Sequence, residues 1–155
     1  MRLALFALAV MVVAPNFSSA SGRPPRLEFI GTFSAFRQTP EHVYGYQLTL
    51  WTDDGTPHAL WARAHGEPAD FPVVRVTDLL WDSASGTIQF TARWCDGTEV
   101  FRGKVGRDVR GTLAAHGRSE NLTLRRGDTA SMGKDQRAEW EAFVSDELKR
   151  RQPKC

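Results

Sequence analysis

Cysteine is scarce in this sequence, and long apolar runs are almost absent. Only two of the 155 residues are cysteine, which excludes the cysteine-rich scaffolds and the four-cysteine zinc sites of many small proteins. The apolar run at residues 3–14 is shorter than the ~20 residues that a membrane-spanning helix needs, and no later run is long enough. We therefore expect no membrane span.

An excess of charge of one sign is also lacking. The chain has 20 Lys and Arg against 18 Asp and Glu, and its arginines are spread along the whole length. Proteins that bind nucleic acid concentrate positive charge on one face, so we expect no nucleic-acid partner. The one basic run, residues 149–154, suits the negative C-terminal end of a helix.

Recognisable catalytic motifs are missing as well. There is no glycine-x-serine-x-glycine nucleophile elbow, and the four histidines do not have the spacing of a zinc helix or finger. We assign no catalytic residue, no metal and no cofactor. An enzymatic alternative stays open through His58 and His65. Three aspartates could complete a carboxylate–histidine pair for proton transfer, namely Asp53, Asp54 and Asp70.

The first 20 residues do contain a recognisable signal. Arg2, the apolar run and the small residues Ser18, Ser19 and Ala20 are the three parts of a secretory signal peptide. We predict cleavage after Ala20, which leaves residues 21–155 as a single domain. The protein is then secreted or periplasmic. An N-terminal anchor that is not cleaved is the alternative.

The two cysteines are Cys95 and Cys155, the last residue of the sequence. In an oxidising compartment such a pair predicts a disulfide. It would join the C-terminus to the hairpin of residues 94–103, whose turn we place at Asp96-Gly97. The alternatives are two free thiols or a bridge to another chain through Cys155.

Apolar and polar residues alternate along most of the mature chain. In residues 88–94, for example, the even positions are apolar and Gln89, Thr91 and Arg93 are polar, which predicts a strand with one buried face. This alternation is typical of antiparallel sheets. Turn residues separate about eight such strands, at residues 27–36, 43–52, 58–64, 72–82, 87–95, 98–105, 108–114 and 120–126.

Near the C-terminus the period changes to that of a helix. Between residues 134 and 151 the apolar residues fall on one side, and they are Trp140, Phe143, Val144 and Leu148. Ser131 or Asp135 could cap the start of this helix, and Pro153 follows its end. The apolar side must pack against the rest of the protein.

Short antiparallel strands joined by short turns predict a meander. Closing the meander into a barrel removes the hydrogen-bonding edges of the sheet. We therefore predict a mainly β protein, an eight-stranded antiparallel barrel with one C-terminal α-helix. The alternative is a β-sandwich, although hairpin-length connections leave little chain for its long crossings.

Three parts of the sequence resemble the calycin barrels, the group that includes lipocalins and avidins. Gly31-Thr32-Phe33 is similar to the glycine-x-tryptophan signature of their first strand, with phenylalanine in place of tryptophan. The glycine-containing strands at residues 101–105 and 109–113 are similar to strands of such barrels. The resemblance implies a barrel whose open mouth holds a small, largely apolar ligand.

The inner face of this barrel decides whether it has room for a ligand. Alternation places large and small residues there, and the large ones are Phe29, Phe33, Tyr44, Tyr46, Leu48, Ile88, Phe90, Trp94 and Phe101. This mixture suits either a cavity lined by aromatic rings or a packed core. If there is a cavity, we expect four residues to line the ligand site: Tyr44, Tyr46, Phe90 and Trp94.

These expectations describe a monomeric binding protein for a small apolar or aromatic compound. The alternative from another class is a protein-interaction module, such as an envelope inhibitor or adaptor. That module would use the loops at residues 37–42 and 65–72 to contact its partner.

Overall fold

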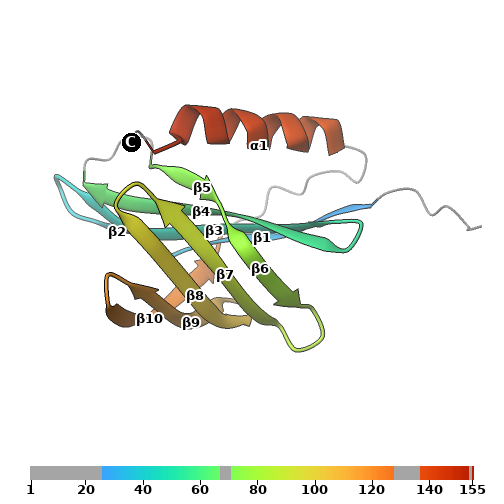
Figure 1. Cartoon of the computed structure of the whole chain (residues 1–155), viewed down its shortest axis with the longest axis horizontal. Coiled ribbons are helices and arrows are strands. Elements are labelled where there is room, and N and C mark those ends of the chain that lie inside the picture. Colours follow the sequence, from blue (N-terminus) through green and yellow to red (C-terminus); the bar gives the residue numbers. More distant parts are fainter. Residues whose placement is uncertain (1–25, 67–70, 128–136, 154) are drawn as a thin grey trace, which may run out of the picture.

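The structure is a computed structural model that describes residues 26–66, 71–127, 137–153 and 155 (Figure 1). The described residues form ten strands and one helix. They are β1 Leu27–Ser34, β2 Arg37–Gln38, β3 Val43–Asp53, β4 Thr56–Gly66, β5 Val73–Arg75, β6 Thr77–Asp82, β7 Thr87–Trp94, β8 Gly97–Val105, β9 Val109–Ala115, β10 Arg118–Arg126 and α1 Arg137–Arg151. The predicted signal peptide, residues 1–20, and both predicted helix caps, Ser131 and Asp135, lie outside the described residues.

The strands form a nearly closed antiparallel barrel. They pair in the order β5-β4-β3-β1-β10-β9-β8-β7-β6, and β2 pairs with β3. The two ends of this path, β5 and β6, follow each other directly in the chain, so the path returns to its start. The predicted fold class is confirmed, with the barrel rather than the sandwich.

The strand count differs from the prediction at two places. The predicted strand 72–82 is divided, because its first half pairs with β4 and its second half with β7. Asp78 takes a positive φ of 52° near the division, a conformation that aspartate tolerates better than most residues. The backbone N–H of Val76 donates to the carbonyl of Ala59 at 3.2 Å. The other additional strand is β2, within the predicted loop 37–42.

The longest hairpin joins β3 to β4. Asp53 pairs with Thr56, which leaves Asp54 and Gly55 as the two turn residues. Both have positive φ, 49° and 79°, and such a turn matches the twist of the flanking strands. This tight turn lets the two strands run the length of the barrel wall.

Helix α1 covers the outside of the barrel, over β4 and β5 (Figure 1). Trp140 and Val144 of the helix are buried against Leu60 and Ala62 of β4, while Ala59 and Trp61 of the same strand face the interior. Because β4 is buried on both faces, its sequence lacks clean alternation. No helix in the described ranges has the length and apolar character needed to cross a membrane.

An irregularity in β1 moves Phe29 to the outer face. Phe29 pairs with Trp51, but Gly31 pairs with Leu50, so the register shifts by one residue between them. Such a bulge reverses the direction of the side chains that precede it. Phe29 therefore packs against Trp140 of the helix, with ring centroids 5.5 Å apart. The prediction that Phe29 faces inward is wrong, whereas Phe33, beyond the bulge, is fully buried inside.

Candidate functional site

The structure separates the four residues predicted to bind a ligand. Phe90 is fully buried in the interior, where its ring stacks on Phe101 at 5.3 Å. Tyr46 stacks on Trp61 at 5.2 Å and is half-buried. Tyr44 is 39% exposed at one end of the barrel. Tyr44 and Tyr46 line one pocket and Trp94 lines another, so the four residues do not share a cavity.

Aromatic rings fill the centre of the barrel. The Trp61 ring meets Phe90 edge-on at 5.2 Å and lies 6.1 Å from Phe101. Gly103 and Gly111 pair across β8 and β9, and a Cβ on either would come within 2.8 Å and 2.7 Å of the Phe101 ring. The two glycines of β8 and β9 therefore leave space for the ring of Phe101.

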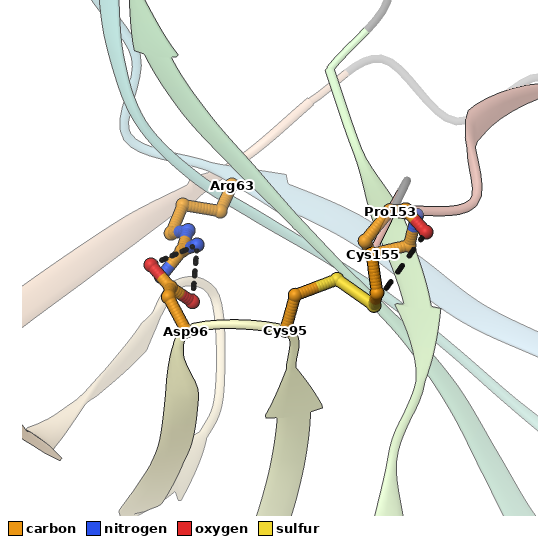
Figure 2. The surroundings of a disulfide bond; sticks show 5 residues. All are labelled: Arg63, Cys95, Asp96, Pro153 and Cys155. Carbon is orange, nitrogen blue, oxygen red and sulfur yellow. Dashed lines mark hydrogen bonds and ion pairs between the residues drawn. A yellow bond between two sulfur atoms is a disulfide. The ribbon is translucent and has the colours of Figure 1, made fainter.

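A charged cluster, formed by Arg63, Asp96 and Glu99, lies beside these rings. Glu99 is only 2% exposed and accepts hydrogen bonds from the indole Nε1 of Trp61 at 2.7 Å and from Arg63 at 3.2 Å. The other end of the Arg63 guanidinium donates to both carboxylate oxygens of Asp96 at 2.9 Å (Figure 2). A buried carboxylate is tolerated only with partners of this kind.

The pKa shifts within this cluster favour the charged forms. The hydrogen bond from Arg63 holds the pKa of Asp96 below its usual value. Burial works to lower the pKa of Arg63, but the hydrogen bond and charge of Asp96 and the charge of Glu99 outweigh it and raise that pKa. Arg63 is therefore a permanent cation at this position.

Sequence reasoning missed this cluster, although one signal for it was present. Glu99 is two residues before Phe101 in β8, so it shares the inward direction of that ring. A charged residue on an inward position needs a buried partner. The partner could not be named from the sequence, because Arg63 is 36 residues away in β4.

The first pocket, which we call the mouth pocket, lies at the end of the barrel beside this cluster. It has a volume of about 500 Å³ and includes Tyr44, Tyr46, Arg63, His65 and Glu120 in its lining. Burial, followed by the charges of Glu99 and Glu120, raises the pKa of Tyr46 to about 12. Glu120 lines the same pocket and is one cause of this shift, so the polar groups of this lining already interact with one another.

The disulfide is confirmed and lies next to the charged cluster (Figure 2). Cys95 and Cys155 are bonded, with their Cα atoms 5.3 Å apart. Trp94 pairs with Gly97, so the hairpin turn consists of Cys95 and Asp96 and not of Asp96 and Gly97 as predicted. One turn therefore carries both the anchor of the C-terminus and an ion-pair partner of Arg63.

The second pocket, which we call the seam groove, lies where β5 and the end of β7 approach the C-terminal end of α1. No strand pairing joins β5 to β7 in the described part of the chain. The groove has a volume of about 510 Å³. Its apolar lining consists of Val73, Val74, Trp94, Leu148 and Pro153, its cations are Arg75, Arg93 and Lys149, and both disulfide cysteines complete its wall.

Trp94 lies between the seam groove and the mouth pocket. Its ring lies 4.6 Å from the guanidinium carbon of Arg63, and Arg63 lines the mouth pocket while Trp94 lines the groove. Trp94 is 8% exposed, and its indole Nε1 is buried without an acceptor among the described residues. The indole Nε1 atoms of Trp81 and Trp140 are buried in the same way.

The two histidines of the enzymatic alternative are not brought together. His58 and His65 lie near opposite ends of β4, about 23 Å apart at ~3.3 Å per residue, and their odd separation places them on opposite faces. His58 stacks on Trp51 at 5.7 Å, and burial, followed by the charge of Arg75, lowers its pKa. Asp70, a predicted partner, lies outside the described residues.

The segments proposed as interaction loops are partly structured. Arg37 and Gln38 form β2, and His65 and Gly66 extend β4. At the end of the second segment, Phe71 packs against Phe36 with ring centroids 5.0 Å apart. Within the described ranges no three potential ligands come together as a metal site. Comparison of the chain with protein-family models, with curated proteins and with solved structures gives no match.

Proposed function

We propose that this protein binds a small, largely apolar or aromatic ligand in the seam groove. The observation that carries the proposal is a groove of about 510 Å³ with a mainly apolar lining that includes the buried ring of Trp94. Sites for small molecules are typically hollows of about 300–1,000 Å³ with apolar walls and a few polar groups. Trp94 was among the four residues predicted for the site.

The groove suits an apolar ligand better than the two other regions of the barrel. The interior is occupied by contacting rings, among them fully buried Phe90 and Phe101. In the mouth pocket the exposed lining is more polar, and the negative charge of Glu120 acts on Tyr46. The lining of the seam groove, by contrast, is mainly apolar and includes the ring of Trp94.

The proposal includes where the protein acts and in what state. The disulfide indicates an oxidising environment, either secreted or periplasmic. Export by a signal peptide cleaved after Ala20, a monomeric mature chain and a relationship to the calycin barrels are further parts of the proposal. A nearly closed antiparallel barrel with a helix on its outside is compatible with that relationship.

A fluorescent probe and a variant that fills the groove test the proposal. The probe is N-phenyl-1-naphthylamine, a neutral aromatic compound that brightens in apolar surroundings, titrated into the disulfide-bonded chain of residues 21–155. Ser145 is an exposed helix residue that lines the groove, so Ser145→Trp adds a large ring there without removing a core side chain. We expect saturable binding that Ser145→Trp weakens at least about tenfold.

Ala142→Trp is the matched control. Ala142 is exposed on the same helix and is not part of the groove lining, so this variant should bind the probe as the unmodified protein does. Equal weakening by both variants, or no saturable binding at all, would refute the proposal. Retention of one identified envelope protein in a pull-down, with no probe binding, would favour the interaction-module alternative instead.

A further inference from the structure

The charges that line the seam groove all have the same sign. Arg75, Arg93 and Lys149 contribute three cations, and the lining contains no aspartate or glutamate. A concave site with walls of low polarity and one sign of charge concentrates ligands of the opposite sign.

These cations are largely free of competing acidic side chains. Arg93 approaches Asp78 at 3.9 Å, but both side chains are about two-thirds exposed, at 66% and 65%, and such a pair is weak. Within the described chain neither Arg75 nor Lys149 takes part in an ion pair. Among the described residues, two of the three cations therefore form no ion pair with an acidic side chain, and Arg75 lies 5.9 Å from the centre of the Trp51 ring.

The neighbouring basic residues of the helix show the contrast. Arg150 and Arg151 both form ion pairs with Glu147, and Arg151 also donates to the carbonyl of Phe71 at 2.6 Å. Burial works to raise the pKa of Glu147, but the hydrogen bonds and charges of these two arginines outweigh burial and lower that pKa. Glu147 is therefore already paired with these two arginines, whereas Lys149 lines the groove.

We infer that the ligand of the seam groove is a small organic anion, with its apolar body against Trp94 and its charged group held by Arg75, Arg93 and Lys149. This inference rests on the proposed function and adds the chemical class of the ligand. A carboxylate, sulfonate or phosphate ester on a flat or branched apolar body has this chemistry.

Ligand pairs that share an apolar body, one with a charged and one with a neutral polar group, test this inference. We would measure binding of 2-naphthoate and of the neutral 2-naphthalenemethanol to the disulfide-bonded chain by isothermal titration calorimetry, and repeat it with decanoate and 1-decanol. Three partly exposed ion pairs of about 0.2–1 kcal/mol each correspond to roughly a 3- to 150-fold preference. We expect the anion to bind about tenfold more tightly, and higher salt to reduce this preference.

Charge variants locate the effect. Arg75→Gln and Lys149→Gln should each reduce the preference for the anion by about twofold or more and leave binding of the neutral partner unchanged. Lys104→Gln removes an exposed lysine of β8 outside the groove and should change neither. Equal affinities within each pair would overturn the inference while the proposed function survives. A preference that Lys104→Gln reduces as much as Lys149→Gln would place the anion elsewhere and also overturn it. No binding of any of the four compounds would count against the proposed function itself.

Discussion

Removal of the disulfide should cost this protein a large part of its stability. The bond joins residues that are 60 positions apart, and the chain-entropy relation assigns a closed loop of that length about 4 kcal/mol at 25 °C. Whole domains of this size are stable by only about 5–15 kcal/mol. The perturbation is the double variant Cys95→Ser/Cys155→Ser, which leaves no thiol in the chain.

Urea unfolding followed by circular dichroism is the assay. With a slope of about 2 kcal/mol per molar urea, a loss of about 4 kcal/mol lowers the unfolding midpoint by about 2 M. The unmodified protein in excess reductant should show nearly the same midpoint as the double variant, and reductant should not affect the variant further. Because Trp140 and Val144 are buried on β4 and β5 independently of the bond, helix α1 should remain docked in the folded variant.

A midpoint that falls by less than about 0.5 M would refute the reasoning. It would mean that the unfolded chain is already so compact that linking its residues 95 and 155 removes little entropy. A helix that is lost before the barrel unfolds would refute the second part. That outcome would show that the bond, rather than the apolar contact, holds α1 in place.

Two further predictions concern the charged cluster and the mouth pocket. Arg63→Met should destabilise the protein by about 3–5 kcal/mol in urea unfolding, because it leaves the buried carboxylate of Glu99 without its cation. Adding Glu99→Gln to this variant should recover part of the lost stability. A further loss would contradict the role of Arg63 as the cation that stabilises Glu99. In Tyr44→Phe, Tyr46 is the only tyrosine left, and absorbance at 295 nm after rapid mixing should show it ionising near pH 12. Since the pKa of this tyrosine in the unfolded chain is about 10, the stability that the protonated phenol contributes is complete below pH 10 and is lost as pH rises toward 12. A titration midpoint of Tyr46 near pH 10 in the folded protein would disprove the shift.

Much of the architecture could be predicted because it depends on residues that are close together in the sequence. The alternation in residues 88–94 predicts a strand whatever its neighbours are, since side chains of a strand point alternately to its two faces. The change of period near the C-terminus predicts the helix in the same way. The pairing of Cys95 with Cys155 needed only their number and an oxidising compartment.

Other features were decided only when distant segments came together. The bulge that turns Phe29 outward depends on the register of β1 with β3. The division of the predicted strand 72–82 near Asp78 arises because its first half pairs with β4 and its second half with β7. Neither leaves a periodic signal, because each is a single-residue departure from the period. The predicted strand 58–64 does not alternate cleanly between apolar and polar residues, because α1 covers a face of it that would otherwise contact water. This contact also joins segments that are far apart in the sequence.

The candidate site was the least predictable part, because its residues come from segments far apart in the chain. Alternation placed Trp94 correctly on the inner side, but it could not show that Arg63 would stack on that ring or that Glu99 would be buried beside it. The seam groove exists because β5 and β7 approach without pairing and the C-terminus is bonded to the turn between β7 and β8. The sequence by itself predicted most of the strands, the helix and the pairing of the two cysteines, since these depend on neighbouring residues and on redox chemistry. Only the tertiary structure decided which side chains share a cavity, because that depends on long-range pairing and register.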